Sequence, residues 1–111
     1  MAEAGIPNPF NGKRVKDLPA SGTTLVESLP LTQFRELRYF IVFFNADETI
    51  SKRMEMSVKK EGTSLTEVVF NRSGQGISLE VNPTENSGDM EMRVSNNELF
   101  DVKMCYTRLT L

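Results

Sequence analysis

Apolar and polar residues alternate along most of this 111-residue chain with a period of two, which is the pattern of a β-strand with one buried face. Residues 89–95 show it plainly, because Met90, Met92 and Val94 alternate with charged side chains. Alternation or a β-branched composition predicts further strands at residues 22–29, 38–45, 50–60, 65–71, 76–82 and 99–111. Only residues 32–37 have a pattern that allows a helical turn, with Thr32 as its cap.

Turn-forming residues separate these segments. Each of the stretches at residues 45–47, 61–62, 72–76, 86–89 and 96–97 contains Asn, Asp, Gly or Ser, which tolerate the backbone angles of tight turns. Short strands joined by hairpin turns are typical of an antiparallel sandwich. We therefore expect an all-β fold, an antiparallel β-sandwich or small jelly roll of about seven or eight strands.

The N-terminal segment has a different composition. Residues 1–12 (MAEAGIPNPFNG) contain two prolines, two glycines and two asparagines, so they cannot continue a helix or a strand ladder. We expect an extended N-terminal arm over residues 1–20, followed by a single β-sandwich domain over residues 21–111. Ile6 and Phe10 are apolar and the residues between them include Asn8, so we expect these two side chains to anchor the arm. The anchoring surface is either the chain's own domain or a neighbouring subunit, and we favour the neighbouring subunit.

Residues 39–44 (YFIVFF) break the alternation, because all six are apolar. A sandwich strand needs only one apolar face, so the other face of this strand must be covered by its own chain or by another subunit. We expect that second face to be an interface made by Phe40, Val42 and Phe44. With the opposite pleat, the interface is made instead by Tyr39, Ile41 and Phe43. We also expect Arg35 and Arg38 to pair with carboxylates across a subunit boundary.

The composition narrows the choice of function. The chain has no histidine and one cysteine, which removes the commonest general base, most zinc chemistry and any internal disulfide. We therefore expect no enzyme and no cofactor. The net charge of −2 argues against nucleic-acid binding. No apolar run reaches the roughly 18–20 residues that span a bilayer, and residues 1–5 lack the features of a signal peptide, so we expect no membrane partner.

Two alternatives involve ligands. Met54 with Met56, and Met90 with Met92, have the spacing of paired thioether donors for copper(I), although methionines on a buried strand face more often fill core space. A carbohydrate-binding sandwich is the other alternative. It needs exposed aromatic residues, whereas this chain has no tryptophan and its Tyr39 and Tyr106 lie within predicted strands.

Two groups of segments resemble small β-sandwich structural proteins of tailed bacteriophages. The entry strands are similar at residues 21–29 (SGTTLVESL), at the Phe34-Arg35 pair and at residues 38–42 (RYFIV). The closing strands are similar at residues 76–79, 87–90, 93–96 and 102–106. The resemblance implies a virion component of the neck, tail, baseplate or fibre region, made in the host cytoplasm. Its partners would be copies of itself and other virion structural proteins, with no small-molecule substrate.

Overall fold

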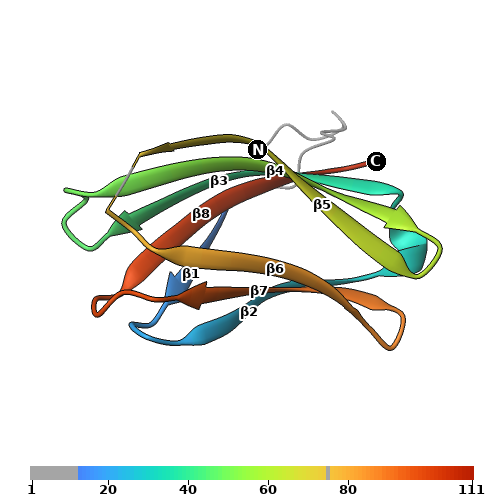
Figure 1. Ribbon diagram of the computed structural model, residues 1–111, viewed down its shortest axis with the longest axis horizontal. Coiled ribbons are helices and arrows are strands. Elements are labelled where there is room, and N and C mark those ends of the chain that lie inside the picture. Colours follow the sequence, from blue (N-terminus) through green and yellow to red (C-terminus); the bar gives the residue numbers. More distant parts are fainter. Residues whose placement is uncertain (1–12, 75) are drawn as a thin grey trace, which may run out of the picture.

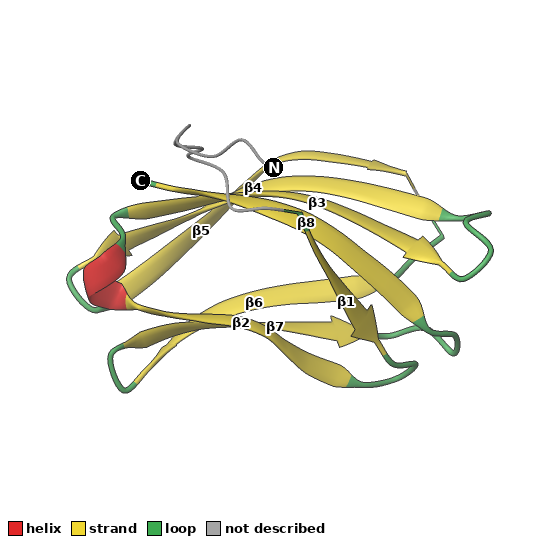
Figure 2. Ribbon diagram, turned by 180° about the vertical axis from the view of Figure 1, so that it is seen from behind, coloured by secondary structure: helices red, strands yellow, loops and turns green. Residues whose placement is uncertain are grey.

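Two antiparallel sheets face each other in this computed structural model, which describes residues 13–74 and 76–111 (Figures 1 and 2). One sheet has five strands in the order β1-β8-β3-β4-β5, and the other has three in the order β2-β7-β6. The bounds are β1 (Arg14–Leu18), β2 (Thr23–Pro30), β3 (Glu36–Asn45), β4 (Ser51–Glu61), β5 (Ser64–Gly74), β6 (Leu79–Asn86), β7 (Asp89–Asn96) and β8 (Val102–Thr110). The expected all-β antiparallel sandwich is therefore confirmed.

The core lies between the two sheets and uses the alternation seen in the sequence. Met90, Met92 and Val94 of β7 are fully buried, while the residues between them lie on the outer side. Strand β3 buries Tyr39, Ile41 and Phe43 in the same way. Because every second residue of a strand points to the same face, these positions pack against one another across the sandwich.

The strand pairs join the two ends of the chain in a nested order. Strand β1 pairs with β8, so that Arg14 lies opposite Tyr106, and β2 pairs with β7, so that Thr23 lies opposite Ser95. Strands β3, β4 and β5 form a meander in which each pairs with the next. Strand β8, the last in sequence, therefore lies between β1 and β3 inside the five-stranded sheet.

The arm predicted over residues 1–20 needs a correction in its second part. Residues Arg14–Leu18 form β1 at the edge of the five-stranded sheet. Only Leu18 of this strand is buried and its other four residues are exposed, so no alternation is visible in the sequence. The predicted anchors Ile6 and Phe10 lie outside the described residues.

Two further local predictions differ from the structure. The helical turn is a 3-10 turn at Leu31–Gln33 that follows Pro30, so the prediction of Thr32 as its cap is wrong; no side chain caps the turn. The strand predicted at residues 76–82 begins at Leu79 and runs through Pro83 to Asn86. Proline lacks the N–H that a ladder needs, and β6 accommodates it because β6 is an edge strand.

Candidate functional site

The outer face of the five-stranded sheet carries a row of apolar side chains. Phe40, Val42 and Phe44 of β3 point to this face and are half-buried, whereas Tyr39, Ile41 and Phe43 lie in the core. The first of the two pleats considered from the sequence is therefore the observed one. Side chains on neighbouring strands extend the row, and we call the set the outer patch: Val15, Phe40, Val42, Phe44, Val68, Phe70, Cys105 and Leu109.

The strand register shows that the outer patch is continuous over β1, β8 and β3, whereas the outward residues of β4 that separate it from β5 are polar: Arg53, Glu55 and Ser57. Val15 lies opposite Cys105, and Cys105 lies opposite Val42, so one line crosses β1, β8 and β3. At the far side Phe70 of β5 is 54% exposed and Val68 is 42% exposed. Large exposed apolar side chains on one sheet face make this surface a candidate for an interaction with another protein.

Arg38 lies on the same face and has partners within its own chain. Its guanidinium carbon is 4.9 Å from the centroid of the Phe70 ring, and its Nε donates to Oε2 of Glu36 at 3.1 Å. The hydroxyl of Ser57 donates to the same oxygen at 2.6 Å. The Ser57 hydrogen bond, with that of Arg38, lowers the pKa of Glu36 below its ordinary value. Arg38 is therefore already paired with a carboxylate of its own strand.

Arg35 does not belong to the outer patch. It lies before β3, where its backbone N–H donates to the carbonyl of Leu111 at 2.7 Å and its carbonyl accepts from the N–H of Lys60 at 3.1 Å. Its side chain is exposed. The structure thus brings together four of the predicted interface residues, on the outer face of β3: Arg38, Phe40, Val42 and Phe44.

The outer face of the three-stranded sheet is polar. The hydroxyls of Thr23 and Ser95 are 2.9 Å apart on neighbouring strands, and Arg93 Nη1 lies 2.8 Å from Oε1 of Glu91. The hydrogen bond from Arg93, with one from Asn86, lowers the pKa of Glu91. The two outer faces of the sandwich therefore differ: one combines the apolar outer patch with polar residues of β3 and β4, and the other is mainly hydrogen-bonded and charged.

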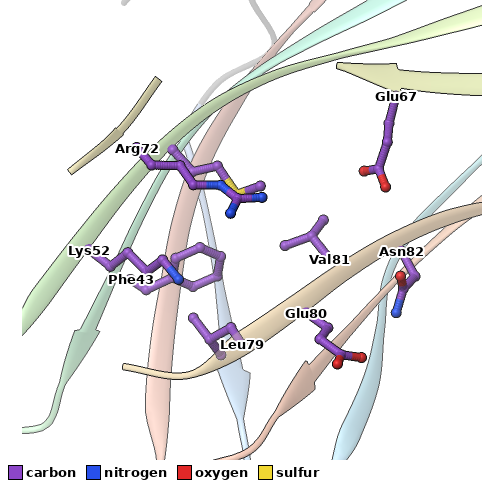
Figure 3. Close-up of a pocket in the computed structure, with 9 residues that line it drawn as sticks. Phe43, Lys52, Glu67, Arg72, Leu79, Glu80, Val81 and Asn82 are labelled. Atoms are coloured by element: carbon purple, nitrogen blue, oxygen red, sulfur yellow. The ribbon is translucent and has the colours of Figure 1, made fainter. Parts of the chain in front are cut away.

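A cleft of about 290 Å³ opens between β5 and β6, where the three-stranded sheet does not cover the wider sheet (Figure 3). Its apolar lining includes Phe43, Leu79 and Val81. Its charged lining consists of Lys52, Glu67, Arg72 and Glu80, so cations and carboxylates are balanced. Partial burial raises the pKa of Glu67. The described lining has no serine, threonine or cysteine, and among the residues described there is no group of three His, Cys, Asp or Glu side chains suited to a metal ion.

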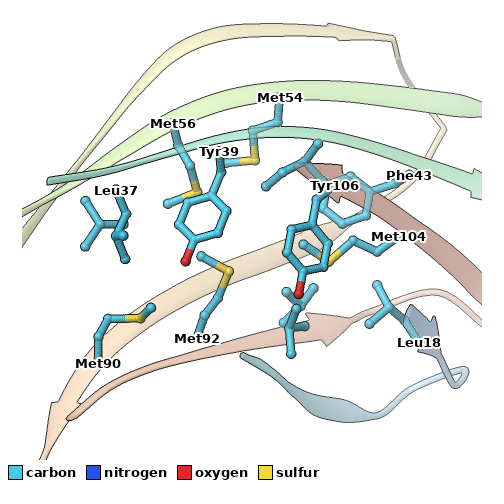
Figure 4. Packing of buried hydrophobic residues seen from close by; sticks show 14 of the residues in the cluster. Leu18, Leu37, Tyr39, Phe43, Met54, Met56, Met90, Met92, Met104 and Tyr106 are labelled. Atoms are coloured by element: carbon cyan, nitrogen blue, oxygen red, sulfur yellow. The ribbon is translucent and has the colours of Figure 1, made fainter. Parts of the chain in front are cut away.

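The methionine pairs considered as copper ligands lie in the core. Met54 and Met56 come from the five-stranded sheet, and Met90 and Met92 come from the three-stranded sheet opposite (Figure 4). All four are buried among leucine, valine and aromatic side chains. This is the packing role of methionine, which fills irregular space between two sheets.

A buried ion pair connects the sheets beside these methionines. Glu27 of β2 lies 2.7 Å from Nη1 of Arg108 on β8, and both side chains are less than 10% exposed. The hydroxyl of Tyr39 donates to Oε2 of Glu27, and that of Tyr106 donates to Oε1 at 3.2 Å. Figure 4 shows both hydroxyls pointing toward the three-stranded sheet. Three groups of one sheet thus bind one carboxylate of the other.

A backbone irregularity places Glu27 in the core. The register of β2 against β7 shifts between Leu25 and Glu27, which leaves Val26 as the extra residue of a β-bulge. Val26 and Glu27 are consequently both buried although they are adjacent in sequence. Burial and the nearby Glu27 charge raise the pKa of Tyr39 above its ordinary value and that of Tyr106 to about 12.

Sequence reasoning missed part of the outer patch. Val68 and Phe70 belong to a run of three apolar residues, and a second bulge at Phe70 hides which face they occupy. Val15 was hidden because β1 has no alternation. The usable signal was the run Val68-Val69-Phe70 itself, since consecutive apolar residues cannot all point inward.

Among the described residues no helix is long and apolar enough to cross a membrane. No protein-family model and no curated protein matches the chain. Similar solved structures include two phage tailspike proteins. The tailspike protein of Acinetobacter baumannii phage AM24 matches with a TM-score of 0.50 and 9% identity, over 93% of this chain and 26% of that one. The tailspike protein of Acinetobacter phage vB_ApiP_P1 matches with a TM-score of 0.52 and 12% identity, over 100% of this chain and 24% of that one.

The chain thus spans about a quarter of each tailspike. At these identities the similarity is one of fold. The sandwich has the fold of a region found in phage tailspike proteins.

Proposed function

We propose that this chain is a structural component of a tailed-phage virion, which acts by packing against copies of itself and against other virion proteins. The outer patch carries the proposal, because it is an apolar surface that one copy leaves partly exposed. The fold shared with two phage tailspikes supports it. The proposed role is non-catalytic and places the chain in the virion, in the neck, tail, baseplate or fibre region.

The N-terminal arm is the second part of the proposal. Residues 1–12 precede β1, and Val15 of that strand belongs to the outer patch. Fully extended, the eight residues from Ile6 to Arg14 span up to about 28 Å and the four from Phe10 to Arg14 about 14 Å, whereas five strands spaced about 4.8 Å apart measure about 20 Å across. An arm of this length can therefore carry Ile6 beyond the edge of its own sheet, toward a neighbouring copy. Arm exchange of this kind would strengthen a ring of subunits.

A charge placed in the outer patch should separate the subunits. We expect Val42→Lys to raise the dissociation constant of the oligomer roughly tenfold or more, because an unpaired ammonium would be buried at the interface. Light scattering across a concentration series measures this. Thr84→Lys is the matched control, since Thr84 is exposed on the polar face. A wild-type chain that is monomeric at every concentration, or equal effects of the two substitutions, would contradict the proposal.

Deleting residues 2–12 should weaken assembly and leave the monomer folded. We expect this because the described residues between Leu18 and Tyr106 already form a buried hydrophobic core between the two sheets. The mass distribution measures assembly, and thermal unfolding of the monomer measures the fold. If the shortened chain no longer folds, the segment is part of its own sandwich, and arm exchange between subunits is wrong.

A further inference from the structure

We propose a second contact between copies, in which β5 pairs in antiparallel orientation with β5 of another copy. The two five-stranded sheets would then join edge to edge. This contact uses the backbone edge of β5 rather than the centre of the outer patch on β3, and it meets the outer patch at Val68 and Phe70.

The four sheet edges differ in how well they are protected against such pairing. Strand β1 has only five residues. Strand β2 is interrupted by its bulge at Val26, and β6 contains Pro83, which has no N–H to donate. Strand β5 also has a bulge, at Phe70, but with eleven residues it is the longest of the four edge strands, and among the described residues it pairs with β4 alone. In the described part of the chain, one side of its backbone is therefore a long row of donors and acceptors without a neighbouring strand.

The charges of β5 are complementary to those of a second copy. Glu67 lies opposite Val58 and Arg72 lies opposite Met54, and both of these β4 residues are buried. Glu67 and Arg72 therefore both point to the inner face. In a regular strand, two residues five positions apart would point to opposite faces. The bulge at Phe70 supplies the extra residue that makes this possible.

Because Phe70 is the extra residue of the bulge, an antiparallel pair whose two-fold axis passes at Val69 places Glu67 of each copy across from Arg72 of the other. The same interaction then forms twice, as two-fold symmetry requires. Opposite charges at facing positions favour strand pairing, and like charges there disfavour it. The charge order of β5 therefore selects a second copy of this chain in one register.

The side chains next to these charges fit the same arrangement. Val68 and Phe70, exposed on the outer side of β5, would be partly covered by the second strand. On the inner side, the cleft between β5 and β6 lies along this edge and contains both Glu67 and Arg72 (Figure 3). In the symmetric pair the clefts of two copies would face each other beneath the joined strands.

A charge exchange tests the pairing, and it is best made in the Val42→Lys chain so that the outer patch does not contribute. We expect this chain to form dimers in a concentration series followed by light scattering. Glu67→Arg or Arg72→Glu alone should raise the dimer dissociation constant roughly tenfold or more, because like charges then face each other. The double variant Glu67→Arg/Arg72→Glu should recover dimerisation to within roughly threefold.

Glu80→Arg is the control, since it makes the same charge change on the β6 side of the cleft and should leave the dimer unchanged. Circular dichroism verifies that each variant is folded. Monomers at every concentration in the Val42→Lys chain, unchanged dimers in both single variants, or no recovery in the double variant would each overturn the pairing of β5. The comparison of Val42→Lys with the wild-type chain tests the outer patch by itself. The proposed interface at the outer patch and the proposed pairing of β5 are therefore tested by different measurements.

Discussion

Replacing Arg108 with methionine should lower the free energy of unfolding by about 3–5 kcal/mol, the range expected when one partner of a buried ion pair is removed. The Glu27 carboxylate would remain in the core without its counter-charge, since Arg108 Nη1 lies 2.7 Å away and both side chains are almost fully buried. The two tyrosine hydroxyls would still donate to Glu27, but a hydroxyl does not neutralise a charge. Urea unfolding followed by circular dichroism measures the loss.

The double variant Glu27→Gln/Arg108→Met provides the control. Glutamine keeps an oxygen that accepts from the tyrosines, and with the charge removed no ion remains unpaired in the core. We therefore expect the double variant to be more stable than Arg108→Met alone. A loss below about 1 kcal/mol for Arg108→Met would show that water or a rearranged side chain compensates Glu27, and that the pair does not hold the sheets together.

Raising the pH should unfold the protein through its two tyrosines. The pKa of Tyr106 is raised to about 12 and that of Tyr39 is raised further, so the folded state holds these protons more tightly than the unfolded state does. A raised pKa contributes stability that is complete below the unfolded value of about 10 and is lost as the pH rises through the folded value. We expect stability to fall from about pH 10 and the protein to unfold near pH 12 or above.

The composition makes this measurement direct. The chain has two tyrosines and no tryptophan. The absorbance of ionised tyrosine at about 295 nm therefore reports on Tyr39 and Tyr106 alone. The phenolate signal should rise together with the loss of β-structure, because a buried phenol cannot ionise beside Glu27 while the sheets are packed. Tyr106→Phe should make the alkaline loss of stability less steep. Full ionisation of both tyrosines in a protein that remains folded would contradict the buried cluster.

Regular alternation predicted the core well where the strands are regular. Every second residue of 90–94 and of 102–106 faces the core, as the spacing indicates, because nothing interrupts the pleat of these strands. The apolar run at residues 39–44 indicated an interface face, and the structure shows Phe40, Val42 and Phe44 on the outer side. The sequence did not show which of the two faces of this strand points outward, because both faces are apolar.

The bulges limited what the sequence could show. Strict alternation in β2 puts Glu27 on the same face as Leu25, which is 45% exposed, and predicts a solvated charge. The bulge at Val26 instead turns Glu27 inward, toward an arginine on the last strand of the chain. In β5 the bulge at Phe70 similarly hid the relation between Glu67 and Arg72. A one-residue insertion leaves no mark in composition, and its effect depends on a partner strand far away in sequence.

The nested strand order has a consequence for how the chain folds. The meander β3-β4-β5 and the hairpin β6-β7 need only neighbours in sequence, whereas β1 and β3 both require β8, and β2 requires β7. Contacts between distant segments form slowly, because a long loop must close before they add stability. Until residues 102–110 insert, the five-stranded sheet is split, with β1 detached and one side of β3 open to other chains. The rate of that last insertion therefore decides whether copies meet as finished sandwiches or as incomplete sheets.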